Sequence, residues 1–246
     1  MNFLHHPGNH WDICHDIRVY PAKIVIRSDY ITRSSSMKHR LLTILFVTVL
    51  CCVPSSHARS GAVPGTTILF FGDSITAGYG LDLEQAFPAI IEDIADADGY
   101  NVEAVNAGVS GETSAGGVRR IDWVLQRPFD IFVLELGGND ALRGVEPENT
   151  KENLQRIIDK VSENRPESVI VLAGMEAPPN MGEDYILEFR QVYRDLAENN
   201  EVIFIPFILE GVAGEPDLNQ ADGVHPTAEG HRIIASHVWP YLEPLL

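Results

Sequence analysis

The sequence predicts an α/β fold in which helices cover both faces of a parallel sheet. From residue 67 to the C-terminus, short apolar runs alternate with longer amphipathic segments, and Gly, Pro, Asn or Asp bounds each run. This alternation is typical of βαβ units. Residues 131–134, Ile-Phe-Val-Leu, are apolar at every position, as expected for a strand that helices bury on both faces. The expected architecture is therefore a three-layer α/β/α sandwich.

The apolar runs are the expected strands, and the amphipathic segments are the expected helices. The strands, in chain order, are Thr67–Phe71, Val102–Asn106, Ile131–Leu136, Ser168–Ala173 and Val202–Ile205. The helices are Leu83–Ala97, Ser114–Leu125, Thr150–Asn164, Tyr185–Asn199 and Pro226–Leu242. Because sheets of this kind bind ligands beyond the carboxyl ends of their strands, the loops that follow each strand are the places to look for a site.

Residues 37–58 resemble an export signal rather than part of the fold. A basic start at residues 38–40 precedes the apolar run Leu41–Val53, and Ser56-His57-Ala58 resembles a cleavage site. The alternatives are an uncleaved membrane anchor and a lipoprotein attached at Cys51. The apolar run is shorter than the ~20 residues that a membrane span needs, so we expect cleavage before Arg59, no stable membrane insertion, and a periplasmic or secreted product.

The remaining chain divides into two parts. Residues 1–36 show no sustained hydrophobic period and end in Arg-Ser-Ser-Ser, so we interpret them as an over-long gene start, with Met37 as the initiator. Residues 59–246 are enough for one domain with a substantial core, which we expect to be a monomer.

Charge and residue usage exclude several classes of function. Six of the 18 Lys and Arg residues and three of the 35 Asp and Glu residues precede Arg59, so residues 59–246 carry a formal charge of −20. That charge disfavours nucleic acids and anionic membranes as partners. All three cysteines also precede Arg59, and three histidines follow it, so we expect no thiol nucleophile, no metal and no cofactor.

A serine follows the first expected strand, in Gly72-Asp73-Ser74-Ile75. Glycine allows a tight turn there, and a helix that begins at once would favour the negative charge that develops in acyl transfer. The alternative is an ordinary turn or N-cap serine.

A possible base for this serine lies ahead of the last expected helix, in Asp222-Gly223-Val224-His225-Pro226. A serine needs a base to remove its proton, and the base needs a carboxylate to fix its tautomer. A turn brings Asp222 back to His225, and Pro226 suits the first position of a helix. The alternative is a structural histidine, which is how we interpret His231 and His237, two residues without a paired carboxylate.

Two more strand-end loops offer hydrogen-bond donors for an oxyanion. Gly111 follows the second strand and can expose a backbone amide, and Asn139 follows the third and offers a side-chain amide. With the Ser74 amide they would form a three-donor oxyanion hole. The alternative for each residue alone is an ordinary role in a loop, because Gly and Asn are common in turns. Because the serine, the donors and the histidine all follow strand ends of one sheet, we expect them to meet.

These blocks resemble the conserved blocks of the SGNH (GDSL-like) hydrolases, in particular the periplasmic acyl-CoA thioesterases, lysophospholipases and arylesterases among them. Similar stretches include Gly-Glu-Thr-Ser at 111–114, Gly-Gly-Asn-Asp at 137–140 and Ala-Pro-Pro-Asn at 177–180. The resemblance implies a flavodoxin-like sheet of strand order 2-1-3-4-5, a shallow acyl groove, and catalysis by Ser74, Asp222 and His225. Ile75 replaces the usual leucine of the first block and keeps its apolar volume.

The expected function is two-step hydrolysis of short or medium acyl esters, aryl esters, lysophospholipids or thioesters, with activity that rises with pH as the histidine base loses its proton. The loop after the fourth strand could line the acyl groove through Met175, Pro178, Pro179 and Met181. Two alternatives remain: a polysaccharide deacetylase with the same catalytic residues, and a non-catalytic lipid- or carbohydrate-binding module. A dinucleotide site is disfavoured because no glycine fingerprint follows a strand.

Overall fold

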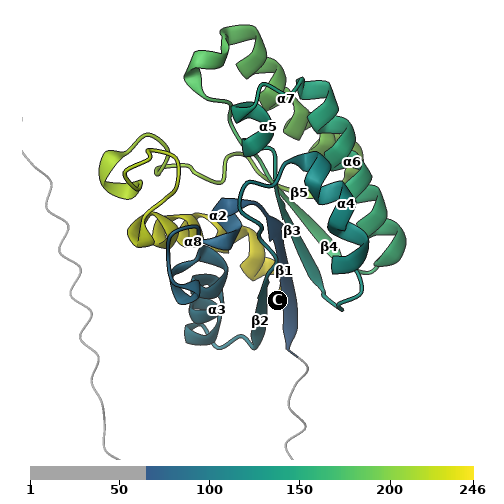
Figure 1. Cartoon of the computed structure of the whole chain (residues 1–246). Coiled ribbons are helices and arrows are strands. Elements are labelled where there is room, and N and C mark those ends of the chain that lie inside the picture. The colour runs from purple at the N-terminus through teal and green to yellow at the C-terminus, as the bar shows by residue number, and fades with distance from the viewer. Residues whose placement is uncertain (1–64) are drawn as a thin grey trace, which may run out of the picture. The chain divides into compact units, whose positions relative to one another are not determined.

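The sheet of this protein has five parallel strands in the order β2-β1-β3-β4-β5 (Figure 1). A computed structural model describes residues 65–246. The strands are β1 (Thr66–Gly72), β2 (Val102–Asn106), β3 (Ile131–Glu135), β4 (Val169–Ala173) and β5 (Ile203–Ile205). The α/β class and the strand order implied by the family resemblance are both confirmed.

Helices lie on both faces of this sheet (Figure 1). One layer contains α3 (Phe87–Ala97) and α8 (Ala228–Leu242), which pack against each other; the other contains α4 (Ser114–Val124), α6 (Pro147–Asn164) and α7 (Glu183–Asn200). Two short helices, α2 (Ser74–Ala77) and α5 (Gly138–Leu142), begin just beyond β1 and β3. Single 3-10 turns cover Leu83–Gln85 (η1), Pro179–Met181 (η2), Pro216–Leu218 (η3) and Glu243–Leu245 (η4).

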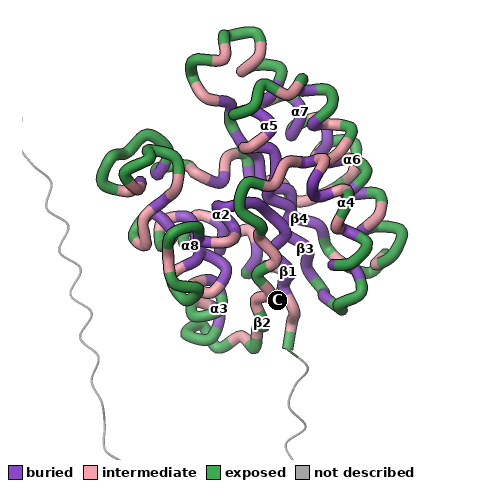
Figure 2. The backbone as a smooth tube through the Cα atoms, in the orientation of Figure 1, coloured by how far each residue is buried: buried purple, intermediate pink, exposed green. Residues whose placement is uncertain are grey.

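The core is centred on the strands, as the buried segments in Figure 2 show. Every residue of β3 is buried, which explains why its sequence does not alternate. Phe70 of β1 packs edge-on against Phe87 of α3 with ring centroids 5.5 Å apart, while the ring centroid of Phe71, the next residue, lies 3.8 Å from the guanidinium carbon of Arg120 in α4. Consecutive side chains of β1 therefore join the two helical layers to one sheet.

Four expected helix starts are wrong. The helices expected from Thr150 and Tyr185 begin earlier, at Pro147 and Glu183, and for the other two a local signal explains the difference. The segment expected as one helix from Leu83 divides at Ala86, whose backbone is extended, because Pro88 fits only the first turn of a helix. The last helix begins at Ala228 instead of Pro226, because the Thr227 side chain accepts a hydrogen bond from the Gly230 amide and caps it. Pro226 instead forms an antiparallel bridge with Asn219.

The expected gene start (1–36) and export signal (37–58) lie outside the described residues and stay predictions. Among residues 65–246, no helix has the length and the apolar character needed to cross a bilayer.

Candidate active site

Ser74 lies in a tight turn where β1 passes into α2. The Asp73 carboxylate caps this helix and accepts a hydrogen bond from the Ile75 amide at 2.9 Å. A Cβ on residue 72 would come within 2.4 Å of a Glu135 carboxylate oxygen, so only glycine fits at the end of β1. The turn therefore presents the Ser74 hydroxyl at the carboxyl edge of the sheet, on the wall of a pocket.

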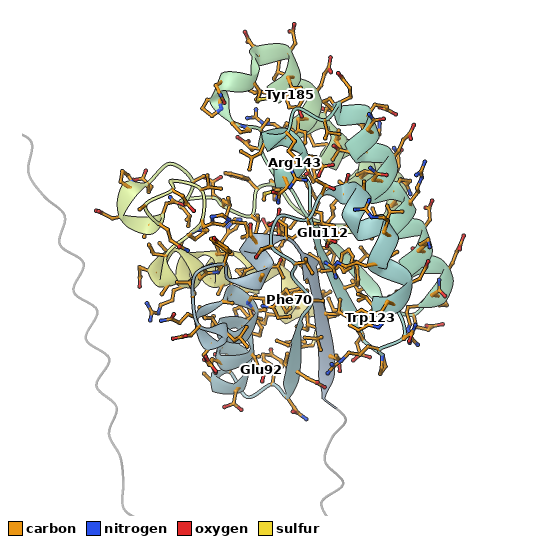
Figure 3. The ribbon with its side chains drawn as sticks, in the orientation of Figure 1. Phe70, Glu92, Glu112, Trp123, Arg143 and Tyr185 are labelled. Atoms are coloured by element: carbon orange, nitrogen blue, oxygen red, sulfur yellow. The ribbon has the colours of Figure 1, made fainter. Side chains whose placement is uncertain are left out.

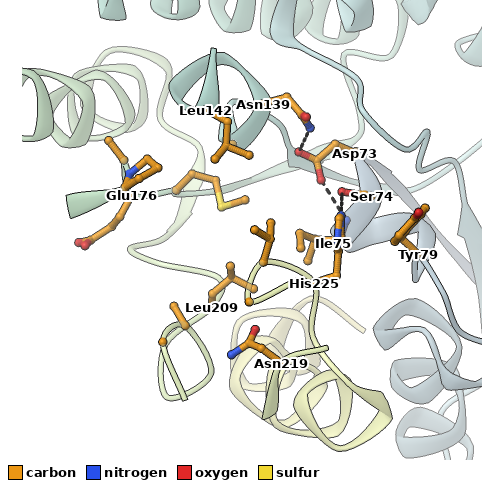
Figure 4. Close-up of a pocket in the computed structure, with 18 of the residues that line it drawn as sticks. Asp73, Ser74, Ile75, Tyr79, Asn139, Leu142, Glu176, Leu209, Asn219 and His225 are labelled. Atoms are coloured by element: carbon orange, nitrogen blue, oxygen red, sulfur yellow. Dashed lines mark hydrogen bonds between the residues drawn. The ribbon is translucent and has the colours of Figure 1, made fainter. Parts of the chain in front are cut away.

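The structure brings Ser74, His225 and Asp222 together in one hydrogen-bonded row, of which Figure 4 shows the contact between Ser74 and His225. His225 Nε2 lies 2.9 Å from Ser74 Oγ, and His225 Nδ1 lies 2.6 Å from Asp222 Oδ2. With Nδ1 protonated toward the carboxylate, Nε2 is left to accept the serine proton. This arrangement is able to activate a serine hydroxyl.

The Asp222 carboxylate also shapes the backbone of its own turn. Its Oδ1 accepts hydrogen bonds from the Val224 and His225 amides at 2.9 and 3.0 Å. The hydrogen bond from the His225 ring and these two amide bonds hold the pKa of Asp222 well below its usual range. Asp222 is therefore ionised wherever His225 can serve as a base.

A second carboxyl group, that of Glu135, lies buried beneath the nucleophile turn. Its Oε2 accepts hydrogen bonds from the Asp73 amide at 3.2 Å, the Thr76 amide at 3.2 Å and the Thr76 hydroxyl at 2.7 Å. Burial, and then the nearby Asp73 charge, raise the pKa of Glu135 well above its usual range. Sequence reasoning missed this role, although a lone Glu in an otherwise apolar strand was a signal.

Two substitutions of Glu135 should distinguish the contribution of its hydrogen bonds to stability from the contribution of its charge. We expect Glu135→Ala to lower the free energy of unfolding by roughly 3 kcal/mol or more, because it leaves several buried donors unpaired. Glu135→Gln keeps an acceptor oxygen and cannot ionise, but burial already opposes ionisation of Glu135. This variant should therefore lower the free energy of unfolding by only about 1 kcal/mol. Urea unfolding of the two variants checks this; equal losses would contradict it.

The two loops expected to supply oxyanion donors face each other across the site. Gly111 has a φ of 76°, and its carbonyl accepts a hydrogen bond from Arg143 at 2.9 Å. Asp140 links the same loops a second time, because its carboxylate accepts hydrogen bonds from the Ser114 amide and hydroxyl at 2.8 and 2.5 Å. Figure 3 shows Glu112 and Arg143 beyond the carboxyl ends of the strands. Gly111 and Asn139 are thereby held at the edge that carries Ser74.

Asn139 is oriented by the residue that precedes the serine. Its Nδ2 donates a hydrogen bond to Asp73 Oδ2 at 2.9 Å (Figure 4). An amide group has two hydrogens, so the second is available to a developing oxyanion. Burial raises the pKa of Asp73 to about 6, against the opposing effect of its bonds from Ile75 and Asn139.

The raised pKa of Asp73 predicts a pH-dependent stability. Between its ordinary pKa of 3.8 and about 6, the folded state binds more protons than the unfolded state, so stability falls as pH rises through this window. Asp73→Asn cannot ionise. The free energy of unfolding of this variant, relative to that of the wild type, should therefore increase between pH 4 and pH 7 by up to roughly 3 kcal/mol. Urea unfolding at several pH values measures the difference; a difference that shrinks as pH rises would refute it.

The pocket beside Ser74 has a volume of about 800 Å³. Three of the four residues expected to bind substrate, Met175, Pro178 and Pro179, line it. Met181 does not line it and packs partly buried against the hydrophobic core.

The opposite wall of the pocket was missed by sequence reasoning. It comes from the segment between β5 and α8, residues 206–227, and includes Phe207, Leu209, Ala213 and Val224. Connections of this length in a compact domain are usually functional, and this one carries apolar residues, so its length was the available signal.

The other two histidines of the fold have structural partners. His231 is buried in α8, its Nδ1 accepts a hydrogen bond from the Phe87 amide at 3.1 Å, and burial lowers its pKa to about 4. His237 donates to the Phe207 carbonyl through Nε2 at 3.0 Å. In residues 65–246, no group of three or more His, Cys, Asp or Glu side chains could hold a metal ion.

Comparisons with known proteins agree with this geometry. Residues 70–233 match the model of the GDSL-like Lipase/Acylhydrolase family. The chain belongs to this family. Esterase TesA of Pseudomonas aeruginosa is 41% identical over 183 residues, covering 73% of this chain and 89% of that protein. The Thioesterase 1/protease 1/lysophospholipase L1 of Escherichia coli K12 is 34% identical, covering 75% and 87%.

Solved structures of GDSL-like esterases share the fold. The crystal structure of TesA has a TM-score of 0.70 and 40% identity, covering 74% of this chain and all of that one. The SGNH-hydrolase family esterase AlinE4 has a TM-score of 0.62 and 42% identity, covering 74% and 97%. As a member of this GDSL-like family, the protein is a carboxylic ester hydrolase.

Proposed function

We propose that this esterase works through a catalytic triad of Ser74, His225 and Asp222. The observation that carries the proposal is the row of two short hydrogen bonds, 2.9 Å from Ser74 Oγ to His225 Nε2 and 2.6 Å from His225 Nδ1 to Asp222 Oδ2. Ser74 attacks the ester carbonyl while His225 removes its proton. Asp222 holds the imidazole in the required tautomer and stabilises its charged form.

The reaction then runs in two steps. The first tetrahedral intermediate collapses when His225 protonates the leaving alcohol, which leaves the acyl group on Ser74. Water, deprotonated by His225, attacks this acyl-enzyme and releases the acid. The amides of Ser74 and Gly111 and the side chain of Asn139 stabilise the oxyanion in both steps, and losing one such donor typically costs about 2.7–4 kcal/mol.

We propose acyl esters and lysophospholipids as the substrates, with the acyl chain in the 800 Å³ pocket. Apolar residues from two loops, Met175 and Pro178 on one wall and Phe207 and Leu209 on the other, offer contacts to an alkyl chain. Relatives that carry the names esterase, arylesterase and lysophospholipase support this class.

Charge predicts a preference for oxygen esters over acyl-CoA. The pocket lining contains Asp73 and Glu176 but no Lys or Arg among the described residues, and residues 59–246 carry a charge of −20. We therefore expect kcat/KM for an acyl-CoA to be lower than for a p-nitrophenyl ester of the same acyl chain at physiological salt. Both can be measured on one enzyme preparation, and a higher value for acyl-CoA would overturn the ranking.

To test the proposal, we would measure the hydrolysis of p-nitrophenyl esters of graded chain length by a protein of residues 59–246. The same protein is assayed on a lysophospholipid and on an acetylated polysaccharide. A p-nitrophenyl phosphonate, which phosphonylates an activated serine, identifies the nucleophile by peptide mass spectrometry. Hydrolysis of the esters with labelling at Ser74 supports the triad. Labelling at another residue refutes it, and cleavage of acetylated polysaccharide alone would assign a deacetylase instead.

We also propose that the protein is exported and acts as a monomer. Support for export comes from the basic start, apolar run and small-residue site in residues 37–58. Fractionation of cells with N-terminal sequencing should place the product outside the cytoplasm with a first residue near Arg59, and light scattering should give the mass of one chain. A cytoplasmic, uncleaved product would refute the export proposal.

A further inference from the structure

The catalytic base and the nucleophile belong to segments that are far apart in sequence, so something must hold the two segments together. His225 follows Ser74 by 151 positions. The hydrogen bond between their side chains does not by itself fix the loops, because it must break and reform during each reaction cycle. Within the part of the chain that the structure describes, the side chain of one residue joins the two backbones directly.

That side chain is Gln220. Its Nε2 donates hydrogen bonds to the Tyr79 carbonyl at 2.7 Å and to the Pro226 carbonyl at 2.9 Å. The first carbonyl belongs to the segment just after Ser74, and the second to the residue just after His225. A carboxamide has two hydrogens, so both bonds can form at once.

Backbone hydrogen bonds connect both residues of this link, Tyr79 and Gln220, to the proposed catalytic residues. The Tyr79 amide donates to the Ser74 carbonyl at 3.0 Å, and the Gln220 amide donates to the His225 carbonyl at 2.7 Å. In addition, the ring of Tyr79 lies over the imidazole of His225 with centroids 4.5 Å apart. Tyr79 therefore contacts the base directly while its own backbone is tied to the nucleophile.

The surroundings leave space for Gln220 and hold its own segment in place. A Cβ on residue 80 would come within 2.5 Å of Gln220 Oε1, and residue 80 is a glycine with a φ of 80°. The neighbouring Asn219 is buried and donates to the carbonyls of Val212 and Glu215 at 2.7 and 2.8 Å. Gln220 thus extends from an anchored position in residues 206–227.

We propose that Gln220 is a positioning residue that sets the distance between Ser74 and His225 by joining their two segments. This inference rests on the proposed triad and adds a residue outside it. Gln220 does not line the substrate pocket, so its loss should lower kcat and leave substrate binding nearly unchanged.

The test compares Gln220→Met, which keeps the length of the side chain but has no donor, with Gln155→Met. Gln155 is a matched control because its Nε2 also makes two hydrogen bonds, to Asp159 and Asn200, at the contact between α6 and α7. Both variants are assayed on p-nitrophenyl butyrate and for the rate of phosphonate labelling at Ser74, and Tm is measured for each.

We expect Gln220→Met to lower kcat and the labelling rate together by about 10- to 100-fold, with KM within about threefold of the wild type. Gln155→Met should leave both rates unchanged. Gln220→Glu, similar in shape but unable to donate when ionised, should lose activity like Gln220→Met. Unchanged rates in Gln220→Met, or full activity in Gln220→Glu, would overturn the proposal. A wild type that is not labelled at Ser74 would instead refute the triad.

Discussion

Replacing Ser74 with alanine should lower kcat/KM for a p-nitrophenyl ester by about 10⁵- to 10⁶-fold. The reason is that the acyl-enzyme cannot form without the Oγ atom, and the oxyanion donors alone give only a small residual acceleration. The side chain makes one described hydrogen bond, to His225 Nε2 at 2.9 Å, so the fold should be retained. Steady-state kinetics and the unfolding midpoint in urea measure the two effects separately.

The control for this experiment is Ser236→Ala. Ser236 is exposed on α8 and donates to the Arg232 carbonyl at 2.9 Å, which is an ordinary contact within a helix. We expect its kcat/KM to stay within about twofold of the wild type. Retention of more than about one hundredth of wild-type activity in Ser74→Ala would show that another residue is the nucleophile.

The Asp222→Asn variant should lower kcat by about 10³- to 10⁴-fold with a small change in KM. Asparagine can keep the Oδ1 that accepts the amides of Val224 and His225, so the turn should be preserved. Its NH2 group, however, would face His225 Nδ1, and the ring would then carry its proton on Nε2. In that tautomer the imidazole cannot accept the proton of Ser74.

This variant also tests how the carboxylate contributes. Asp217→Asn is a suitable control, because Asp217 is exposed in the same connection between β5 and α8 and does not line the pocket. It should keep wild-type kinetics. If Asp222→Asn and Asp217→Asn had equal activity, the hydrogen bond of 2.6 Å to His225 would have no role in the reaction.

The meeting of Ser74, Gly111, Asn139 and His225 could be expected from the sequence because all parallel strands end at one edge of the sheet. Ser74, Gly111 and Asn139 come soon after short apolar runs, and His225 lies in the connection that follows the last one, so the position of the strands was enough to predict the edge at which these residues meet. The residues that hold them could not be found in this way. Glu135 and Asp73 contribute through hydrogen bonds across the sheet edge, and such pairings depend on the three-dimensional positions of atoms.

The helix boundaries show a second limit of sequence reasoning. Pro226 and Thr227 are both good starting residues, one for the first helical position and one for the cap, and the two rules predict different starts. The helix follows the cap, because the Thr227 side chain accepts a hydrogen bond from the Gly230 amide, while Pro226 pairs with Asn219, seven positions earlier, in a bridge that neither rule takes into account. The wall formed by Phe207 and Leu209 was missed for a different reason, because the length of the connection at residues 206–227 was not taken as a signal.

The position of His225 has a consequence for how the site depends on the fold. His225 lies between β5, at the edge of the sheet, and α8, which packs on α3, whereas Ser74 follows β1 inside the sheet. The proposed nucleophile and its base therefore meet only where these parts of the domain are folded together. Esterase activity accordingly reports the integrity of the tertiary structure, and its loss in urea should accompany the loss of the fold.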